Sequence, residues 1–217
     1  MKRRLLACEV IRAELEEALK ATDNEYDIVW VGEALHDKPE QLHKELVRII
    51  EQSDAFDEIV ISYGLCGNAL IGIKAVHCDI IYPKTDDCIS ALMCTNKNLG
   101  ELRRCSIFTS RGWLSASHSV SEYERTLEKY GKNRADMIYD MMFGNYKKLI
   151  YMQTEEEIDP ENMKKAEKEA EIKKLKVEIE QASIDIYNKL LNTEEGEHIK
   201  RLKKGESITY DNFHKII

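Results

Sequence analysis

Short apolar runs alternate with amphipathic stretches along most of this chain, and this alternation constrains the fold more than any other feature. The runs predict strands at Arg4–Cys8, Tyr26–Val31, Glu58–Ser62, Asp79–Tyr82, Ser106–Thr109 and Leu149–Gln153. The stretches between them predict helices at Val10–Ala21, Pro39–Gln52, Cys88–Lys97, Ser121–Tyr130 and Arg134–Phe143. This order is typical of an α/β fold. We expect a Rossmann-like, mostly parallel sheet with helices on both faces.

The pattern changes after Pro160. Apolar residues then recur at steps of three or four among Lys and Glu, namely Ile172, Leu175, Ile179, Ala182, Ile186 and Leu190. This spacing predicts a long C-terminal amphipathic helix with a narrow apolar seam. We therefore expect an α/β domain over residues 1–155 and a helical extension over residues 156–217. The extension could pack on that domain, on a partner or on another copy of the chain.

Charge and hydropathy exclude several functional classes. The formal net charge is −8 and no basic stripe is present, which argues against nucleic-acid binding. The N-terminus resembles a lipoprotein signal ending at Cys8, but its apolar part is only Leu5-Leu6-Ala7. Signal peptides need an apolar region of roughly 7–15 residues. No stretch is long enough to span a membrane, so we expect a cytoplasmic protein.

A cytoplasmic location changes how the six cysteines are interpreted. A reducing compartment disfavours disulfides, which leaves metal binding, catalysis or burial. Cys8, Cys66 and Cys88 each follow a predicted strand, as do His36 and Arg111. Ligands bind outside the carboxyl ends of the strands in open parallel sheets. We therefore expect these three cysteines to come together and form the functional site.

The segment Tyr63-Gly64-Leu65-Cys66-Gly67-Asn68 is the most specific motif. Two glycines around a cysteine allow positive φ angles and close approach of the backbone to a ligand. The alternative is an ordinary tight turn whose cysteine points inward.

Cys88 follows Asp86-Asp87 and opens a predicted helix. The positive end of a helix dipole favours a thiolate there. Alternatively, one of these aspartates is a simple N-cap and Cys88 is buried. Cys8 could likewise be a core residue, although Glu9 beside it offers a base or a ligand.

The other cysteines, Cys78, Cys94 and Cys105, fall before a strand or inside a helix. We interpret them as structural residues.

The segments Ala7-Cys8-Glu9, Leu35-His36-Asp37, Tyr63–Asn68, Asp87-Cys88 and Gly112-Trp113 together resemble the family catalogued as domain of unknown function 1638. The resemblance implies a cytoplasmic protein of anaerobic bacteria or methanogenic archaea. Such proteins are often encoded among corrinoid-dependent methyltransferases. The chain departs from the family in having Ala69 where a glycine is usual, and Pro83-Lys84-Thr85 where the family has an Arg-rich turn.

The first hypothesis is a zinc site with Cys8, Cys66 and Cys88 as thiolate ligands and His36 or Glu9 as the fourth ligand. A zinc ion with an open position could activate a thiol, which would suit methyl or alkyl transfer with a corrinoid or thiol substrate. We expect catalytic roles for Glu9, His36 and Arg111, and cofactor contacts from Gly64, Gly67, Asn68 and Trp113.

Three alternatives stay open. The cysteines could hold an iron–sulfur cluster. The chain could be a non-catalytic accessory protein that binds a cofactor or partner through Tyr63, Asn68, Arg111 and Trp113. It could also be a metal-free thiol enzyme with Cys66 as nucleophile and His36 as base. Expected partners are a small molecule or a corrinoid protein, without nucleic acid or membrane, and the C-terminal helix could mediate homo-oligomerisation.

Overall fold

Two compact units make up the chain. The computed structural model describes residues 1–32, 35, 38–116 and 119–213. One unit comprises Met1–Cys94 with Ser183–Ile217, and the other comprises Thr95–Ala182. The domain boundary expected after residue 155 coincides with neither junction. Each unit contains its own sheet, so the single sheet expected from the sequence is wrong.

The first unit contains a five-stranded sheet of order β2-β1-β3-β4-β8. Its strands are β1 (Arg3–Cys8), β2 (Tyr26–Val31), β3 (Glu58–Ile61), β4 (Asp79–Pro83) and β8 (Ile199–Leu202). The first four are parallel and β8 is antiparallel to β4. The mostly parallel α/β arrangement predicted from the apolar runs is confirmed for this unit.

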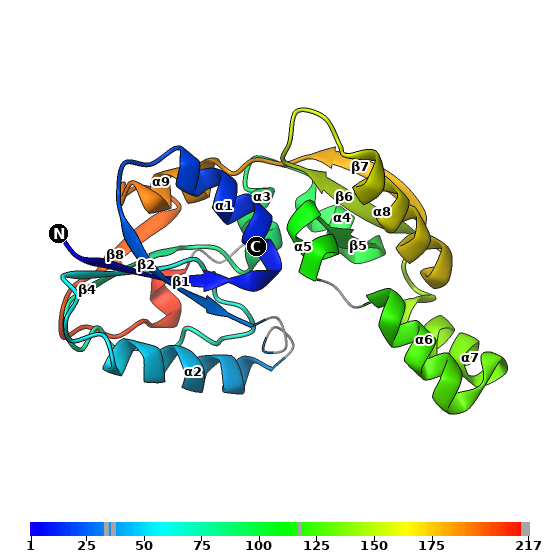
Figure 1. Cartoon of the computed structure of the whole chain (residues 1–217), viewed down its shortest axis with the longest axis horizontal. Helices are drawn as coiled ribbons and strands as arrows, with labels where there is room; N and C mark the ends of the chain where they lie inside the picture. The colour runs from blue at the N-terminus through cyan, green and yellow to red at the C-terminus, as the bar shows by residue number, and fades with distance from the viewer. Residues whose placement is uncertain (33–34, 36–37, 117–118, 214–217) are drawn as a thin grey trace. The chain divides into compact units, whose positions relative to one another are not determined.

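Helices pack on both sides of this sheet. A short 3-10 helix, η1 (Glu9–Ile11), leads directly into α1 (Arg12–Lys20). Helices α1 and α9 (Asp185–Leu191) lie on one side of the sheet, and α2 (Pro39–Glu51) lies on the other side (Figure 1). The buried face of α2 consists of Leu42, Leu46, Ile49 and Ile50, at the helical spacing seen in the sequence. The short α3 (Cys88–Leu92) and the 3-10 helix η3 (Tyr210–Asn212) complete the unit.

The order in which successive strands are added to the sheet changes direction at β1. From β1 the chain passes through α1 to β2 on one side, and then through α2 to β3 on the other side of β1. Such a switch point opens a crevice at the carboxyl ends of the two flanking strands, where open α/β sheets bind ligands. Cys8 is the last residue of β1 and therefore lies at this crevice.

The second unit contains a parallel sheet of order β5-β6-β7. Its strands are β5 (Ser106–Thr109), β6 (Lys148–Gln153) and β7 (Lys176–Gln181). Its helices are α4 (Leu99–Cys105), α5 (Arg111–Ala116), α6 (Ser119–Tyr130), α7 (Lys132–Phe143) and α8 (Pro160–Lys173). Its core is formed by Leu114, Leu149, Tyr151, Ala166 and Ala170.

The long C-terminal helix predicted from the sequence is wrong. Helix α8 ends at Lys173, and Lys174 adopts a left-handed conformation with φ of 57°. After Leu175, the six residues Lys176–Gln181 form β7, which pairs with β6. Here Val177 and Ile179 alternate with charged residues, and this period of two matches a strand. The expectation of self-association through that helix therefore loses its basis.

No helix in the described parts of the chain is long and apolar enough to cross a membrane.

A buried ion cluster links strands β1, β3 and β8 of the first sheet. The Glu58 carboxylate at the start of β3 accepts hydrogen bonds from Arg3 Nε of β1 at 2.9 Å and from Arg201 Nη1 of β8 at 2.5 Å. The Glu58 side chain is only 2% exposed. Arg201 Nε also pairs with Glu195 at 2.9 Å, but the Glu195 side chain is 59% exposed.

We predict that Glu58→Ala lowers the free energy of unfolding by about 3–5 kcal/mol, because it removes the buried carboxylate that both Arg3 and Arg201 contact. Glu195→Ala removes an exposed partner of the same Arg201 and should cost at most about 1 kcal/mol. Urea denaturation of both variants and the wild type measures the difference. Equal losses for the two variants would contradict the assignment.

Candidate functional site

Cys8, Cys66 and Cys88 line one cavity in the first unit. Its volume is about 250 Å³. It is lined by Cys8, Pro39, Leu42, Ser62, Tyr63, Cys66, Gly67, Asp87, Cys88 and Ile89. Cys8 ends β1, while Cys66 and Cys88 follow β3 and β4, so all three lie near the carboxyl ends of adjacent parallel strands. The structure thus brings together the residues that the sequence selected by their position after strands.

Cys8 is held by the residues that follow β3. Its backbone N–H donates to Ser62 Oγ at 2.8 Å. The Tyr63 hydroxyl lies within reach of both the Cys8 thiol and the Val31 carbonyl, the latter at 3.3 Å. Both Cys8 and Tyr63 are buried, so little of this edge of the cavity is exposed to solvent.

Cys66 is placed by close contact between two loops. The N–H of Leu65 donates to the carbonyl of Thr85, and the N–H of Cys66 donates to that of Asp86, both at 2.7 Å. A Cβ on Gly64 would lie 2.4 Å from the Thr85 carbonyl oxygen. Only glycine therefore allows the loop after β3 to approach the loop after β4 so closely.

The turn at Cys66 has an unusual backbone. Cys66, Gly67 and Asn68 have φ angles of 44°, 66° and 73°. Positive φ at a non-glycine residue costs on the order of 1–3 kcal/mol and must be compensated by the surroundings. Of the two glycines around Cys66, Gly67 has the expected positive φ angle. Gly64 instead allows the two loops to approach each other closely. Asn68 is exposed and does not line the cavity.

Cys88 is the first residue of α3. Asp87 is the N-cap, and its side chain accepts a hydrogen bond from the N–H of Ser90 at 2.8 Å. The helix has five residues and ends at Leu92, short of the predicted Lys97. The capping role considered for Asp87 is present, and Cys88 still faces the cavity.

Burial and mutual repulsion disfavour the thiolate form of these cysteines. Burial raises the pKa of Cys8 to about 11, although the nearby amides of Val10 and Ile11 partly offset it. Burial and then the neighbouring thiols also raise the pKa values of Cys66 and Cys88. For Cys88 this direction is opposite to that expected from a helix N-terminus. The metal-free site therefore holds neutral thiols at pH 7.

Glu14 is part of the site's surroundings, although the sequence analysis missed it. It lies on α1, is completely buried, and contributes to the raised pKa values of Cys8 and Cys88. A signal was available, because Glu14 shares a helix face with the buried Ile11, Leu15 and Ala18. An acid within an apolar stripe is a candidate for function.

Other expected site residues lie elsewhere. Glu9 does not line the cavity; its side chain is 37% exposed and lies 3.8 Å from Arg12 Nη1. His36 falls outside the described residues. Arg111 and Trp113 belong to the second unit, where they open α5 after β5.

The cavity contains suitable donors but no ready-made metal site. Within the described ranges, no three Cys, His, Asp or Glu side chains are already arranged to hold a metal ion. The donor types still fit a soft metal ion, because three thiols share one cavity near a buried carboxylate. Cys78, Cys94 and Cys105 do not line it.

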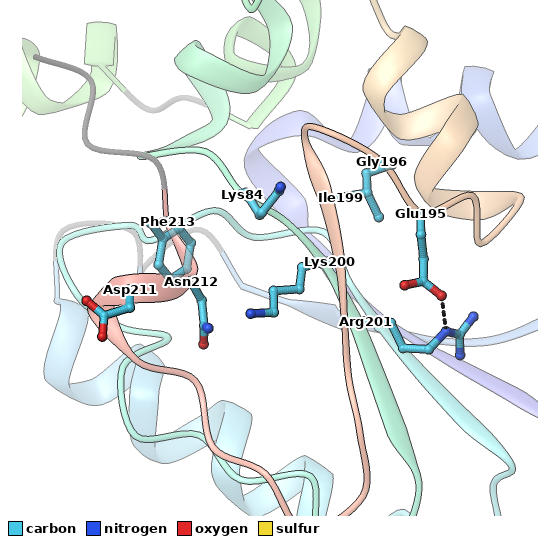
Figure 2. A pocket seen from close by; sticks show the side chains of 9 residues that line it. All are labelled: Lys84, Glu195, Gly196, Ile199, Lys200, Arg201, Asp211, Asn212 and Phe213. Carbon is cyan, nitrogen blue, oxygen red and sulfur yellow. Dashed lines mark hydrogen bonds and ion pairs between the residues drawn. The ribbon is translucent and has the colours of Figure 1, made fainter.

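A second pocket of the first unit, beside β8, differs in chemistry. Figure 2 shows its lining residues, which are Lys84, Glu195, Gly196, Ile199, Lys200, Arg201, Asp211, Asn212 and Phe213. It contains no cysteine or histidine. The amino groups of Lys84 and Lys200 point in different directions, so they do not form a common anion site.

Comparison with known protein families assigns the chain to one of them. The family described as "Protein of unknown function (DUF1638)" matches residues 30–191. The chain belongs to this family. The match includes Cys66 and Cys88, while Cys8 precedes it. No curated protein and no solved structure matches this DUF1638 protein.

We predict that Gly64→Ala destabilises the DUF1638 protein by about 1–3 kcal/mol, because the added Cβ forces the two loops apart. Gly196→Ala is the matched control, since a Cβ there meets nothing within 4 Å. Thermal or urea unfolding of both variants tests this. A loss of stability in Gly196→Ala as large as that in Gly64→Ala would contradict the argument that Gly64 is needed for close approach of the two loops.

The raised pKa of Cys8 predicts a pH-dependent contribution to stability. A pKa raised from 9.0 to about 11 favours the folded state below pH 9, and this contribution disappears as pH rises through 11. In the metal-free protein, the stability difference between wild type and Cys8→Ala should therefore shrink by about 2 kcal/mol between pH 8 and pH 11. Urea denaturation at both pH values measures it. A difference that stays constant would contradict the prediction.

Proposed function

We propose that this protein binds one soft divalent metal ion, with zinc as the first candidate, through Cys8, Cys66 and Cys88. The observation that carries this proposal is that three thiols from three separate strand ends line one small cavity. Sulfur ligands of this kind suit zinc and other soft metals. Ligands brought from separate strand ends also differ from the paired cysteines of structural zinc fingers.

The electrostatics of the cavity support a cation as its ligand. Cys8 raises the pKa values of Cys66 and Cys88, and Cys66 also raises that of Cys88. Glu14 acts in the same direction on Cys8 and Cys88. A metal ion removes this conflict, because thiolates bind it in place of their protons. Binding would release protons, so metal affinity should rise with pH. The thiols must rotate toward a common centre, since they do not yet form a ligand set.

Only a few side chains are candidates for the fourth ligand of the metal ion. His36 and Glu9 are the candidates from the sequence. Glu9 interacts with Arg12 at the surface, whereas Glu14 is a buried carboxylate near the thiols. We therefore add Glu14 to the candidates. A site with only three protein ligands would keep one position open for a substrate.

The reaction class that we propose is methyl or alkyl transfer involving a thiol. A substrate thiol would lose its proton on binding, and its sulfur would form the new bond to carbon. The electron pair of the broken bond would stay on the donor. The cavity of about 250 Å³ is below the roughly 300–1,000 Å³ of typical ligand pockets. A corrinoid donor would therefore remain outside the cavity, carried by a partner.

Two alternatives use the same region. An iron–sulfur cluster would need the same three cysteines but would absorb visible light, whereas a zinc thiolate site does not. A non-catalytic accessory protein would bind its partner at this crevice and should tolerate Cys8→Ser and Cys88→Ser.

We predict about one zinc per chain in protein purified without oxygen, and metal affinity lowered at least 100-fold by Cys8→Ser/Cys66→Ser/Cys88→Ser. The matched control, Cys78→Ser/Cys94→Ser/Cys105→Ser, removes the same number of thiols and should bind metal as the wild type does. Elemental analysis and competition with a chromogenic chelator measure content and affinity.

The outcomes separate the hypotheses. Iron with sulfide and a visible spectrum would support the cluster instead of zinc. Metal content below one ion per several chains, with no binding on titration, would reject the metal site. Equal affinities of the two triple variants would reject these cysteines as ligands.

A further inference from the structure

The Tyr187 side chain on α9 carries a polar group that the structure leaves unused. Its ring is completely buried. Its hydroxyl is also buried and has no hydrogen-bond partner among the described residues. Buried polar groups are nearly always paired, so an isolated hydroxyl in a native structure requires an explanation. A ligand or a changed charge state nearby would supply the missing acceptor.

The surroundings of Tyr187 point to the cysteine site. Helix α9 packs against α3, which begins with Cys88, and against α1, which carries Glu14. It also contacts β4, whose carboxyl end borders the site. Burial raises the pKa of Tyr187, and Cys88, Cys8, Cys66 and Glu14 raise it further. The hydroxyl therefore lies where negative charge on these sulfurs would be felt.

We propose that Tyr187 is a positioning residue whose hydroxyl donates a hydrogen bond to a thiolate of the cysteine site. This inference rests on the proposed function, in which Cys8, Cys66 and Cys88 become thiolates on binding a metal. A neutral thiol is a weak acceptor, whereas a thiolate is a strong one. The unpartnered hydroxyl of the metal-free state would thus gain its acceptor when metal binds.

Tyr82 provides a matched control within the same unit. It lies on β4, is completely buried, and its hydroxyl also has no hydrogen-bond partner within the part of the chain that the structure describes. Its ring packs near Phe213, and Glu206 rather than a cysteine acts on its hydroxyl. Tyr82→Phe and Tyr187→Phe therefore remove the same group from equally buried positions, but only Tyr187 has the site's cysteines among the groups that act on its hydroxyl.

Titration of the full-length, metal-free protein with Co²⁺ under anaerobic conditions tests the proposal. Co²⁺ reports thiolate ligation through a sulfur-to-metal absorption band. Tyr187→Phe should lower Co²⁺ affinity about tenfold, as expected when a hydrogen bond to a metal ligand is lost. The same variant should move the band to longer wavelength. Tyr82→Phe should match the wild type in both measurements.

Several results would overturn the proposal. An unchanged affinity and band for Tyr187→Phe, or equal changes in both variants, would exclude a specific role for this hydroxyl.

If the wild type binds neither Co²⁺ nor Zn²⁺, the proposed function fails, and alkylation of Cys8, Cys66 and Cys88 then decides the role of Tyr187. Mass spectrometry at pH 9 should show iodoacetamide reacting several-fold more slowly in Tyr187→Phe than in the wild type and Tyr82→Phe. Equal rates would refute the hydrogen bond. Thermal unfolding of the metal-free variants confirms that both are folded.

Discussion

Two backbone hydrogen bonds between neighbouring loops determine the geometry of the candidate site. They join Leu65 to Thr85 and Cys66 to Asp86, each at 2.7 Å. The parallel sheet places the ends of β3 and β4 side by side, and these bonds hold the following loops together. Because Gly64 has no side chain, nothing prevents the contact. Cys66 and Cys88 consequently line one cavity with Cys8.

The same arrangement creates an electrostatic conflict within the cavity. Three thiols line one small cavity, and the buried Glu14 and Tyr187 act electrostatically on them or are acted on by them. Neutral thiols avoid repulsion in the metal-free state, and a bound cation would remove it in another way. A cluster of buried groups with perturbed pKa values is typical of functional sites. Simple core packing would be served better by apolar side chains, which carry no such penalty.

The comparison between prediction and structure shows where local patterns are sufficient. The strand Tyr26–Val31 and the helix beginning at Pro39 have the predicted start points, because a continuous apolar run and a proline at a helix start are local signals. The segment that forms β7 was predicted to be helical, because apolar residues at steps of three or four concealed the alternation of apolar and charged residues around Val177 and Ile179. Pairing of β7 with β6 overrides the helical pattern there.

The sequence by itself determined strands β1 to β6, their mostly parallel arrangement and the selection of Cys8, Cys66 and Cys88 over the other cysteines. Residues directly after parallel strands share one edge, so their proximity follows from chain order alone. Only the tertiary structure decided that Arg111 and Trp113 belong to a second unit and that Glu14 and Tyr187 lie near the thiols. Glu14 is on the buried face of helix α1, and Tyr187 is on α9, which is far from the three cysteines in the sequence. Such proximity depends on how helices pack on the sheet, which no local pattern of residues records.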